Sequence, residues 1–283
     1  MVAELQSLPN VRLMPRSTAI GVFDHGIHAV LERTGDHIAA PGAGKPRQIL
    51  WRVYAKRSLL CAGATERLIS FADNDRPGIM QAGAVRGYVN RFAATPAEHV
   101  AVFTNNDDGH RTATDLAAAG VDVAAIIDSR PDAPKSEVAE VFAGAVVSGT
   151  GGRLGIGHVD IRLAGGGRKH VQCGALAVSG GWNPNVHLTC HHRGRPAWQD
   201  DICAFVPGEG VPPGMAVAGA ARGVFSTAGT IGDGQAQAIA SLPRSASTLP
   251  RTRFPRQKTR RCGSPRYGMF RARNAPGSTS RTM

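Results

Sequence analysis

The clearest hydrophobic pattern consists of two apolar runs that flank a segment of helical periodicity. The runs are residues 100–103 and 121–127, and each has the length of a buried strand. Between them Asp107 or Asp108 can cap a helix, and Gly120 can end it. A strand, a helix and a second strand at this spacing predict a βαβ unit with parallel strands.

A second unit is predicted upstream. Ser58–Cys61 is a short apolar run that breaks at Ala62-Gly63-Ala64, where small residues allow a close approach to the backbone. Asn74 can then cap a helix and Pro77 suits its first turn. Apolar residues recur at helical spacing after that, at Ile79, Ala82, Val85, Val89 and Phe92.

The rest of the pattern is weaker and consists mostly of short strands. A hairpin turn is predicted at 24–26 between two alternating segments. Further strands are predicted at 11–14, 18–23, 27–31, 48–54, 145–148, 153–163, 169–178 and 215–218, and a closing helix at 226–240. Together these elements predict an α/β fold.

Charge is distributed unevenly along the chain. The protein has 283 residues and a net charge of +12, which taken alone suggests a nucleic-acid partner. Residues 243–283, however, hold 11 Lys and Arg and no Asp or Glu, which leaves 22 basic and 21 acidic residues in 1–242. The body is therefore nearly neutral. The tail, rich in Arg, Pro, Ser and Thr, has too few apolar residues for a core and is expected to be disordered.

Cysteine usage and hydropathy bear on the compartment. The five cysteines are scattered and include no C-x-x-C pair (Cys61, Cys173, Cys190, Cys203 and Cys262). No signal peptide is recognisable, and no apolar run approaches the ~18 residues that a membrane span requires. These features are typical of a reduced, cytoplasmic protein without a membrane partner.

The chain also carries a family resemblance. AKRSLLCAGATER at 55–67 resembles the "ATG" segment of flavoproteins with two nested dinucleotide-binding domains. In order along residues 3–240, further segments resemble the alpha subunit of heterotetrameric sarcosine oxidase: VFDHG (22–26), LERTGDH (31–37), PRQILWRVYAKR (46–57), FADNDRPGIM (71–80), VFTNND (102–107), AVSGGWNPNVHL (177–188) and AFVPG (204–208).

This resemblance implies an organisation and a function. It implies two nested Rossmann-like domains, a discontinuous first one at 1–96 and 171–242 and an inserted, degenerate one at 97–170. The first lacks its upstream phosphate loop in this sequence. The family oxidises sarcosine to glycine with release of hydrogen peroxide and transfers the one-carbon unit to tetrahydrofolate. NAD is expected in the alpha subunit, and FAD and FMN on or with the beta subunit. Beta, gamma and delta subunits are the expected partners, and the folate domain is absent from this sequence.

Nine residues are candidates for contact with a dinucleotide. By the resemblance, NAD in the first domain would meet three small-residue turns, namely Ala62-Gly63-Ala64, Gly180-Gly181-Trp182 and Gly219-Ala220. The alternative is that these are ordinary turns at strand ends. Ala220 stands where the broader family often has an Asp that bonds the flavin, which argues against tight flavin binding. Asp128, at the end of a strand, is placed to accept a hydrogen bond from a ribose hydroxyl.

The turn at 104–109 has lost most of a dinucleotide fingerprint. It sits where a βαβ unit would carry G-x-G-x-x-G, but Thr104 and Asn106 replace the first two glycines and only Gly109 matches. Asp107 and Asp108 stand where an anion would bind, although both could be helix caps. We expect a degenerate scaffold here rather than a dinucleotide site.

Other chemistry is weakly supported. Cys190-His191-His192 suggests a metal, but adjacent side chains diverge whereas zinc ligands converge, so no metal site is expected there. No spacing identifies a catalytic residue.

An inactive remnant or non-catalytic subunit is the first alternative to the oxidase. A nucleic-acid arm in the basic tail is a weaker one. The abrupt change of composition where the likeness ends is what an out-of-frame reading of GC-rich coding sequence produces, and this explanation of the tail is preferred.

Overall fold

The computed structural model describes residues 2–40 and 42–242, and the expected tail at 243–283 lies outside this range. The described chain forms two compact units. The first takes in residues up to 65, 183–199 and 204–242, and the second takes in 66–182 and 200–203. The chain passes between them in β5 (Ala64–Glu66) and β14 (Trp182–Pro184), which pair with each other.

These units are drawn differently from the expected nested domains. The expected insertion at 97–170 lies inside the second unit, which also includes 66–96 and 171–182. The nested boundaries stay a prediction.

The second unit is built on a five-stranded parallel sheet in the order β6-β13-β7-β8-β9. The predicted βαβ unit is present as β7, α3 and β8. The elements of the sheet and its helices are β6 (Ile79–Gln81), α2 (Ala82–Phe92), β7 (His99–Thr104), α3 (Asp107–Ala118), β8 (Asp122–Asp128), β9 (Val141–Ala143) and β13 (Ala175–Ser179).

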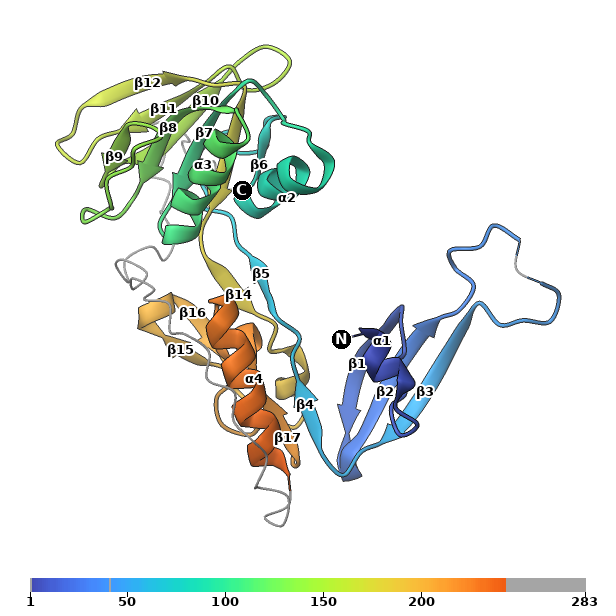
Figure 1. Cartoon of the computed structure of the whole chain (residues 1–283). Coiled ribbons are helices and arrows are strands. Elements are labelled where there is room, and N and C mark those ends of the chain that lie inside the picture. The colour runs from blue at the N-terminus through green and yellow to red at the C-terminus, as the bar shows by residue number, and fades with distance from the viewer. Residues whose placement is uncertain (1, 41, 243–283) are drawn as a thin grey trace, which may run out of the picture. The chain divides into compact units, whose positions relative to one another are not determined.

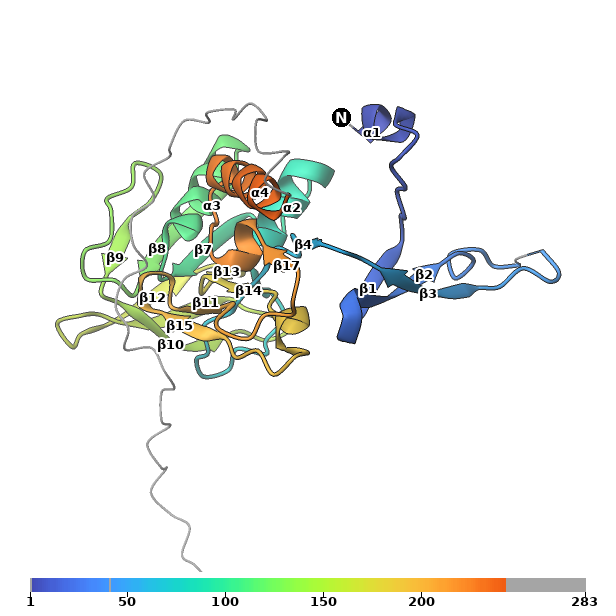
Figure 2. The same cartoon turned by 90° about the horizontal axis from the view of Figure 1, so that it is seen from below.

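Both faces of this sheet are covered. Val100 and Val102 of β7 pack with α2 and α3, while Ala101 and Phe103 point to the opposite face, because side chains alternate along a strand. That opposite face packs against an antiparallel sheet of β10 (Val146–Gly151), β11 (His158–Arg162) and β12 (Arg168–Gln172). The unit therefore has three layers, with α2 and α3 on one face of the parallel sheet and the antiparallel sheet on the other (Figures 1 and 2). The central strands have unbroken hydrophobic runs because both of their faces are buried.

The described part of the first unit contains several smaller sheets. An antiparallel sheet consists of β1 (Ser17–Phe23), β2 (Ile27–Arg33) and β3 (Gln48–Tyr54), with the predicted turn at Asp24–Gly26. Another pairs β4 (Ser58–Leu60) in parallel with β17 (Met215–Val217). The unit also holds α1 (Val2–Ser7), the hairpin of β15 (Ala197–Gln199) and β16 (Ala204–Val206), and the closing helix α4 (Thr227–Ser241).

The helix predicted to start after an Asn74 cap begins later than expected. Residues Ile79–Gln81 form β6 and pair with Leu176–Val178 of β13, so α2 starts at Ala82. The pairing partner lies far along the sequence, and local periodicity could not reveal it. Asn74 and Pro77, the expected helix-start residues, lie in the turn that precedes β6.

Two predicted strands were also wrong. Residues 11–14 form no regular element, and the span 169–178 divides into β12 and β13. The division falls at Cys173-Gly174, where the chain leaves the antiparallel sheet for the parallel one. Among the described residues, no helix combines the length and the apolar character needed to cross a membrane.

Candidate functional site

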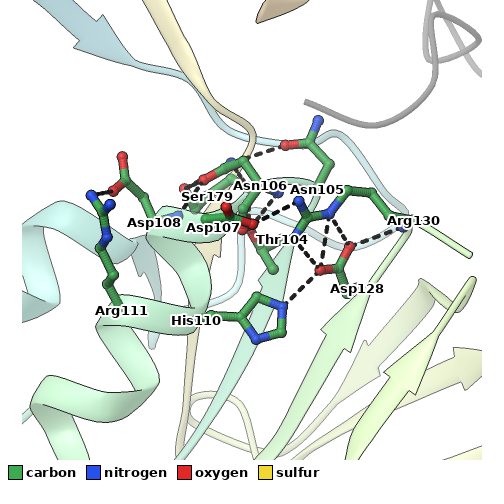
Figure 3. A network of polar contacts seen from close by, with 10 residues as sticks. All are labelled: Thr104, Asn105, Asn106, Asp107, Asp108, His110, Arg111, Asp128, Arg130 and Ser179. Atoms are coloured by element: carbon green, nitrogen blue, oxygen red, sulfur yellow. Dashed lines mark hydrogen bonds and ion pairs between the residues drawn. The ribbon is translucent and has the colours of Figure 1, made fainter. Parts of the chain in front are cut away.

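The polar candidates gather at one edge of the parallel sheet in the second unit. Parallel strands end at the same edge, so Thr104 of β7, Asp128 of β8 and Ser179 of β13 lie side by side there. Figure 3 shows the resulting network of polar contacts. This is the edge at which α/β folds bind their ligands.

The turn after β7 is held by its own side chains. The Thr104 hydroxyl donates to the Ser179 carbonyl at 3.1 Å, and the Asn106 amide donates to the same carbonyl at 3.0 Å. Asn106 Oδ1 accepts from the Asp108 backbone N–H at 2.9 Å and so caps α3. The expected cap at Asp107 or Asp108 was therefore wrong by one or two positions. The amide that could meet a phosphate at this helix N-terminus is already bonded within the protein.

Gly109 keeps the structural role of the third fingerprint glycine. A Cβ at this position would collide with the Thr104 side chain, so only glycine lets α3 pack this closely on β7. Thr104 and Asn106, in the first two glycine positions, instead fill the turn with side chains. The packing function of the motif is present, and its open phosphate cradle is not.

Asp128 is wholly buried and fully engaged. Its carboxylate contacts Arg130 Nη2 and His110 Nε2, each at 2.8 Å, and accepts the Arg130 backbone N–H at 2.9 Å. Burial alone would raise the pKa of Asp128, but the hydrogen bonds from His110 and Arg130 outweigh it and hold the pKa below its ordinary value. Its expected role toward a ribose stays a prediction, and that role requires Arg130 to give up contacts made here.

Arg130 is the residue that sequence reasoning missed. It is buried, and it bridges Asp128 to Asp107 at 2.8 Å. Burial would lower the pKa of its guanidinium, but the two carboxylates raise it above its ordinary value. Of the two carboxylates expected to repel an anion, Asp107 is therefore partly compensated by Arg130, and Asp108 pairs with Arg111 at 3.1 Å. The only sequence signal was an arginine two residues after Asp128, which is too common to interpret alone.

A second buried carboxylate closes the N-terminus of α2. Glu66 is 8% exposed, and its Oε2 accepts the Gly83 backbone N–H at 2.8 Å. A Cβ at Gly83 would come within 2.6 Å of that oxygen, so the glycine makes room for the carboxylate. Desolvation raises the pKa of Glu66, and the hydrogen bonds from Gly83 and Ser179 offset only part of the rise. Both helices on this face thus have their N-termini occupied by side chains of the chain itself.

Gly180, Gly181 and Trp182 follow β13. A Cβ on Gly180 would lie 2.8 Å from the Arg67 carbonyl, and Gly181 has a positive φ of 96°, so backbone packing and conformation require both glycines. The Trp182 indole donates to Asp108 Oδ2 at 2.6 Å. These contacts fit the alternative of a strand-end turn, while the expected cofactor contact stays a prediction.

The remaining candidates lie in the first unit and come together there. β4 and β17 are parallel neighbours, so the turns that follow them, with Gly63 and Gly219, lie at the same edge. Ala218 N–H donates to the Leu60 carbonyl at 3.0 Å, and Asn185 Nδ2 donates to the Ala62 carbonyl at 2.9 Å. The Ala62–Ala64 turn therefore lies beside the Gly219-Ala220 turn. It is also hydrogen-bonded to Asn185, the last residue of the SGGWNPN segment at 179–185.

The fit of a dinucleotide to these turns differs on the two sides. Gly63 has a φ of 72° and open space where a Cβ would be, so a ligand could approach its backbone. Gly219 has a φ of 68°, but its N–H donates to Asp233 Oδ2 at 2.8 Å. Asp233 also binds Arg222 at 2.7 Å. A ligand could therefore approach the backbone of the Ala62–Ala64 turn. The backbone N–H of Gly219, next to Ala220, is already bonded to Asp233.

The Cys190-His191-His192 run does not converge. His191 Nδ1 accepts the Val22 backbone N–H at 3.1 Å, His192 lies 3.6 Å from Asp24, and the Cys190 thiol points to the Val186 carbonyl at 3.5 Å. The three side chains have separate partners, as expected for residues that are adjacent in sequence.

Comparison with known proteins identifies relatives. The chain is 41% identical over 239 residues to the alpha subunit of sarcosine oxidase from Rhizobium meliloti (strain 1021). It is 36% identical over 256 residues to that of Corynebacterium sp. (strain P-1). These matches cover 84% and 85% of this chain but 24% and 26% of the relatives, so the chain spans about a quarter of their length. No protein-family model matches the chain.

Solved structures share the fold at low sequence identity. L-proline dehydrogenase from P. horikoshii matches with a TM-score of 0.55 at 20% identity, over 80% of this chain and 39% of that one. Thioredoxin reductase from Lactococcus lactis matches with a TM-score of 0.58 at 15% identity, over 80% and 73%. At such identities the likeness shows the fold alone. The chain thus has a Rossmann-like α/β fold, and along most of its length it is related to the alpha subunits of sarcosine oxidase.

Proposed function

We propose that the chain is an oxidoreductase component of the sarcosine oxidase alpha type. In this proposal it acts in a complex with beta, gamma and delta subunits that oxidises sarcosine to glycine, releases hydrogen peroxide and passes the one-carbon unit to tetrahydrofolate. The observation that carries the proposal is the 41% identity over 239 residues to a sarcosine oxidase alpha subunit.

The proposed NAD site is the edge formed by the turns after β4 and β17. Ala62, Gly63 and Ala64 would contact the dinucleotide through the backbone, because Gly63 leaves that backbone open. Gly219 and Ala220 would border the site on the strand beside it. NAD, when bound, can accept or donate a hydride, and flavins held with the beta subunit would carry the oxidation itself. The contribution of this chain is to bind and orient the dinucleotide.

In the second unit, side chains of the chain itself already bond the groups that a dinucleotide would contact, which supports the proposal. The turn after β7 is closed by Asn106, and Asp128 is held by Arg130 and His110. We infer that this unit is a scaffold and that a dinucleotide would bind in the first unit. The second candidate function, a non-catalytic subunit, shares this scaffold but assigns no cofactor to either unit.

A reconstituted complex tests the proposal. The full-length chain is co-expressed with the beta, gamma and delta subunits, and sarcosine-dependent peroxide release is compared with the three partners alone. We expect the complex to co-purify and peroxide release to depend on this chain. A complex that forms but gives no peroxide would favour the non-catalytic subunit, and failure to form any complex would contradict the proposal.

The cofactor site is tested with a matched pair of glycine variants. Gly63 and Gly44 both have positive φ, of 72° and 77°, and both have open space where a Cβ would be. Valine therefore costs similar backbone strain at each. Gly63→Val is expected to lower the NAD content of the purified complex at least about tenfold, and Gly44→Val to leave it unchanged. Equal NAD content in both would remove the site from the Ala62–Ala64 turn.

A further inference from the structure

Three potential metal ligands share the outer face of the antiparallel sheet in the second unit. Along β11 and β12 the apolar residues Val159, Ile161 and Val171 are buried against the parallel sheet. The alternation of a strand then places His158, Asp160 and His170 together on the opposite face. This is the face of the β10–β12 layer that is turned away from the parallel sheet.

Strand register brings these three side chains within reach of one another. Asp160 and His170 are direct cross-strand partners, and His158 lies two residues from Asp160 on the same face. Each offers one ligand atom, and these atoms all lie within 4.8 Å of one another. His170 Nδ1 is 2.7 Å from Asp160 Oδ1, and the two histidine rings lie 3.8 Å apart between centroids.

The neighbouring strand leaves the group uncovered. Gly151 is the partner of His158 across the β10–β11 pair, and a Cβ at Gly151 would collide with the histidine ring. Gly149, opposite Asp160, likewise brings no side chain over the carboxylate. Asp160 and His170 are each 48% exposed, so an ion could reach the group from solvent.

We propose that His158, Asp160 and His170 form a binding site for a divalent cation of the zinc class. Two imidazoles and one carboxylate suit Zn²⁺, Co²⁺ or Ni²⁺, whereas Mg²⁺ and Ca²⁺ prefer oxygen ligands. In a tetrahedral site, ligands about 2.0–2.1 Å from zinc are separated by roughly 3.4 Å. The present separations, from 2.7 Å between His170 Nδ1 and Asp160 Oδ1 to within 4.8 Å for the group, lie on both sides of that value. Water would complete the coordination.

Two arginines beside the group weaken the electrostatic attraction of a cation to the site. Arg162 and Arg168 are cross-strand partners and are exposed at the far end of the two strands. Their positive charge opposes every divalent cation, so the affinity of the site depends on the imidazole nitrogens, which are good ligands for zinc-class ions. Asp160 is the one carboxylate in the group, so the three side chains offer a single oxygen ligand, and Mg²⁺, which prefers oxygen ligands, would bind weakly.

Cobalt titration of the full-length chain tests the proposal. The protein is freed of metal with a chelator, and Co²⁺ is added while the visible absorption of nitrogen-bound Co²⁺ is followed. We expect one strongly absorbing equivalent that Zn²⁺ displaces and excess Mg²⁺ does not. His158→Gln, Asp160→Asn and His170→Gln are each expected to weaken Co²⁺ binding at least about tenfold.

The matched control is another exposed histidine–aspartate pair of the same unit. His99 Nδ1 lies 2.8 Å from Asp122 Oδ2, with both side chains more than 60% exposed, and among the described residues the pair has no second histidine beside it. His99→Gln is expected to leave Co²⁺ binding unchanged. Loss of binding in His99→Gln but not in His170→Gln would overturn the proposal, as would the absence of the cobalt absorption. Thermal melts of each variant verify folding, and Zn²⁺ should raise the melting temperature only of proteins that keep all three ligands.

Discussion

At the scale of single residues, the second unit depends on charges that lie inside it. Asp128 has no exposed surface, and Arg130 is 3% exposed. Such a pair is costly to bury, and removal of one partner leaves the other charge uncompensated. The Asp128 carboxylate is compensated by hydrogen bonds from three donors on Arg130 and one on His110. The residue that the sequence suggested for a ligand is therefore also the residue that holds this edge of the sheet together.

Asp128→Asn tests this interpretation. The amide keeps the size of the carboxylate but leaves the buried Arg130 with only Asp107 as a charged partner, so we expect a loss of about 3–5 kcal/mol in the free energy of unfolding. Urea denaturation measures it. The control is Asp122→Asn, which breaks the exposed pair with His99 and should cost less than about 1 kcal/mol. Similar losses of unfolding free energy in both variants would show that the buried pair contributes no more to stability than the exposed pair.

The buried Glu66 leads to a prediction about pH, because its pKa is raised whereas the pKa of Asp128 is lowered. Desolvation raises its pKa, so the folded state holds the proton more tightly than the unfolded chain does. Its contribution to stability is therefore fully present below the unfolded pKa and declines as the pH rises through the folded pKa. Glu66→Gln keeps an acceptor for the Gly83 N–H without the charge. We expect this variant to melt at the same temperature or higher than the parent at neutral pH.

Thermal melts at a series of pH values separate this effect from ordinary surface titration. The advantage of Glu66→Gln should shrink as the pH falls toward 4.5, the ordinary pKa of a glutamate, because the parent carboxylate is then itself protonated. Glu137→Gln, at an exposed position, is the control and should follow the parent at every pH. An advantage that grows on acidification would contradict the assigned direction.

At the scale of elements, the sequence predicted what local pattern determines. β7, α3 and β8 are recognisable because apolar runs, helix periodicity and Gly120 all act within a few residues of one another. β3 and α4 were predicted for the same reason. The start of α2 was not, because Ile79–Gln81 become a strand only through pairing with β13, which lies far along the chain. The candidate site shows the same limit, since Arg130, Glu66 and Asn106 have roles that depend on neighbours brought in by the sheet.

The contact between α3 and β7 gives an element-scale prediction. A Cβ at Gly109 would collide with Thr104, so Gly109→Ala forces the helix away from the strand. We expect a net loss of about 1–3 kcal/mol, although alanine is intrinsically the better helix former. Gly87 in α2 has no neighbouring atom within 4 Å of the position that a Cβ would take, and Gly87→Ala should stabilise by about 0.5–1 kcal/mol. Opposite signs in urea denaturation would support the packing role, and stabilisation by both would refute it.

At the scale of the whole molecule, the question is what the chain can bind without partners. A pyrophosphate is normally held by free backbone N–H groups at a helix N-terminus. Among the described residues, each helix of eight residues or more has a side chain there. Glu66 accepts from α2, Asn106 accepts from α3, and Ser226 accepts the Gly229 N–H of α4 at 3.2 Å. The proposed site at the Ala62–Ala64 turn, where Gly63 leaves open space, follows a strand and precedes no helix.

We therefore expect the isolated chain to bind neither NAD nor FAD tightly and to release no peroxide from sarcosine. Two missing charge-assisted hydrogen bonds, at roughly 1.5–3 kcal/mol each, weaken a micromolar site to about the millimolar range or beyond. Calorimetric titration of the full-length chain with each cofactor measures this, followed by a peroxide assay with sarcosine. The same preparation joined with beta, gamma and delta subunits is the control, because the complex is where the NAD site is proposed to form. A dissociation constant below about 10 micromolar for the chain alone would contradict the argument. Peroxide release from the chain alone would contradict it independently, since the oxidation would then need no partner flavin.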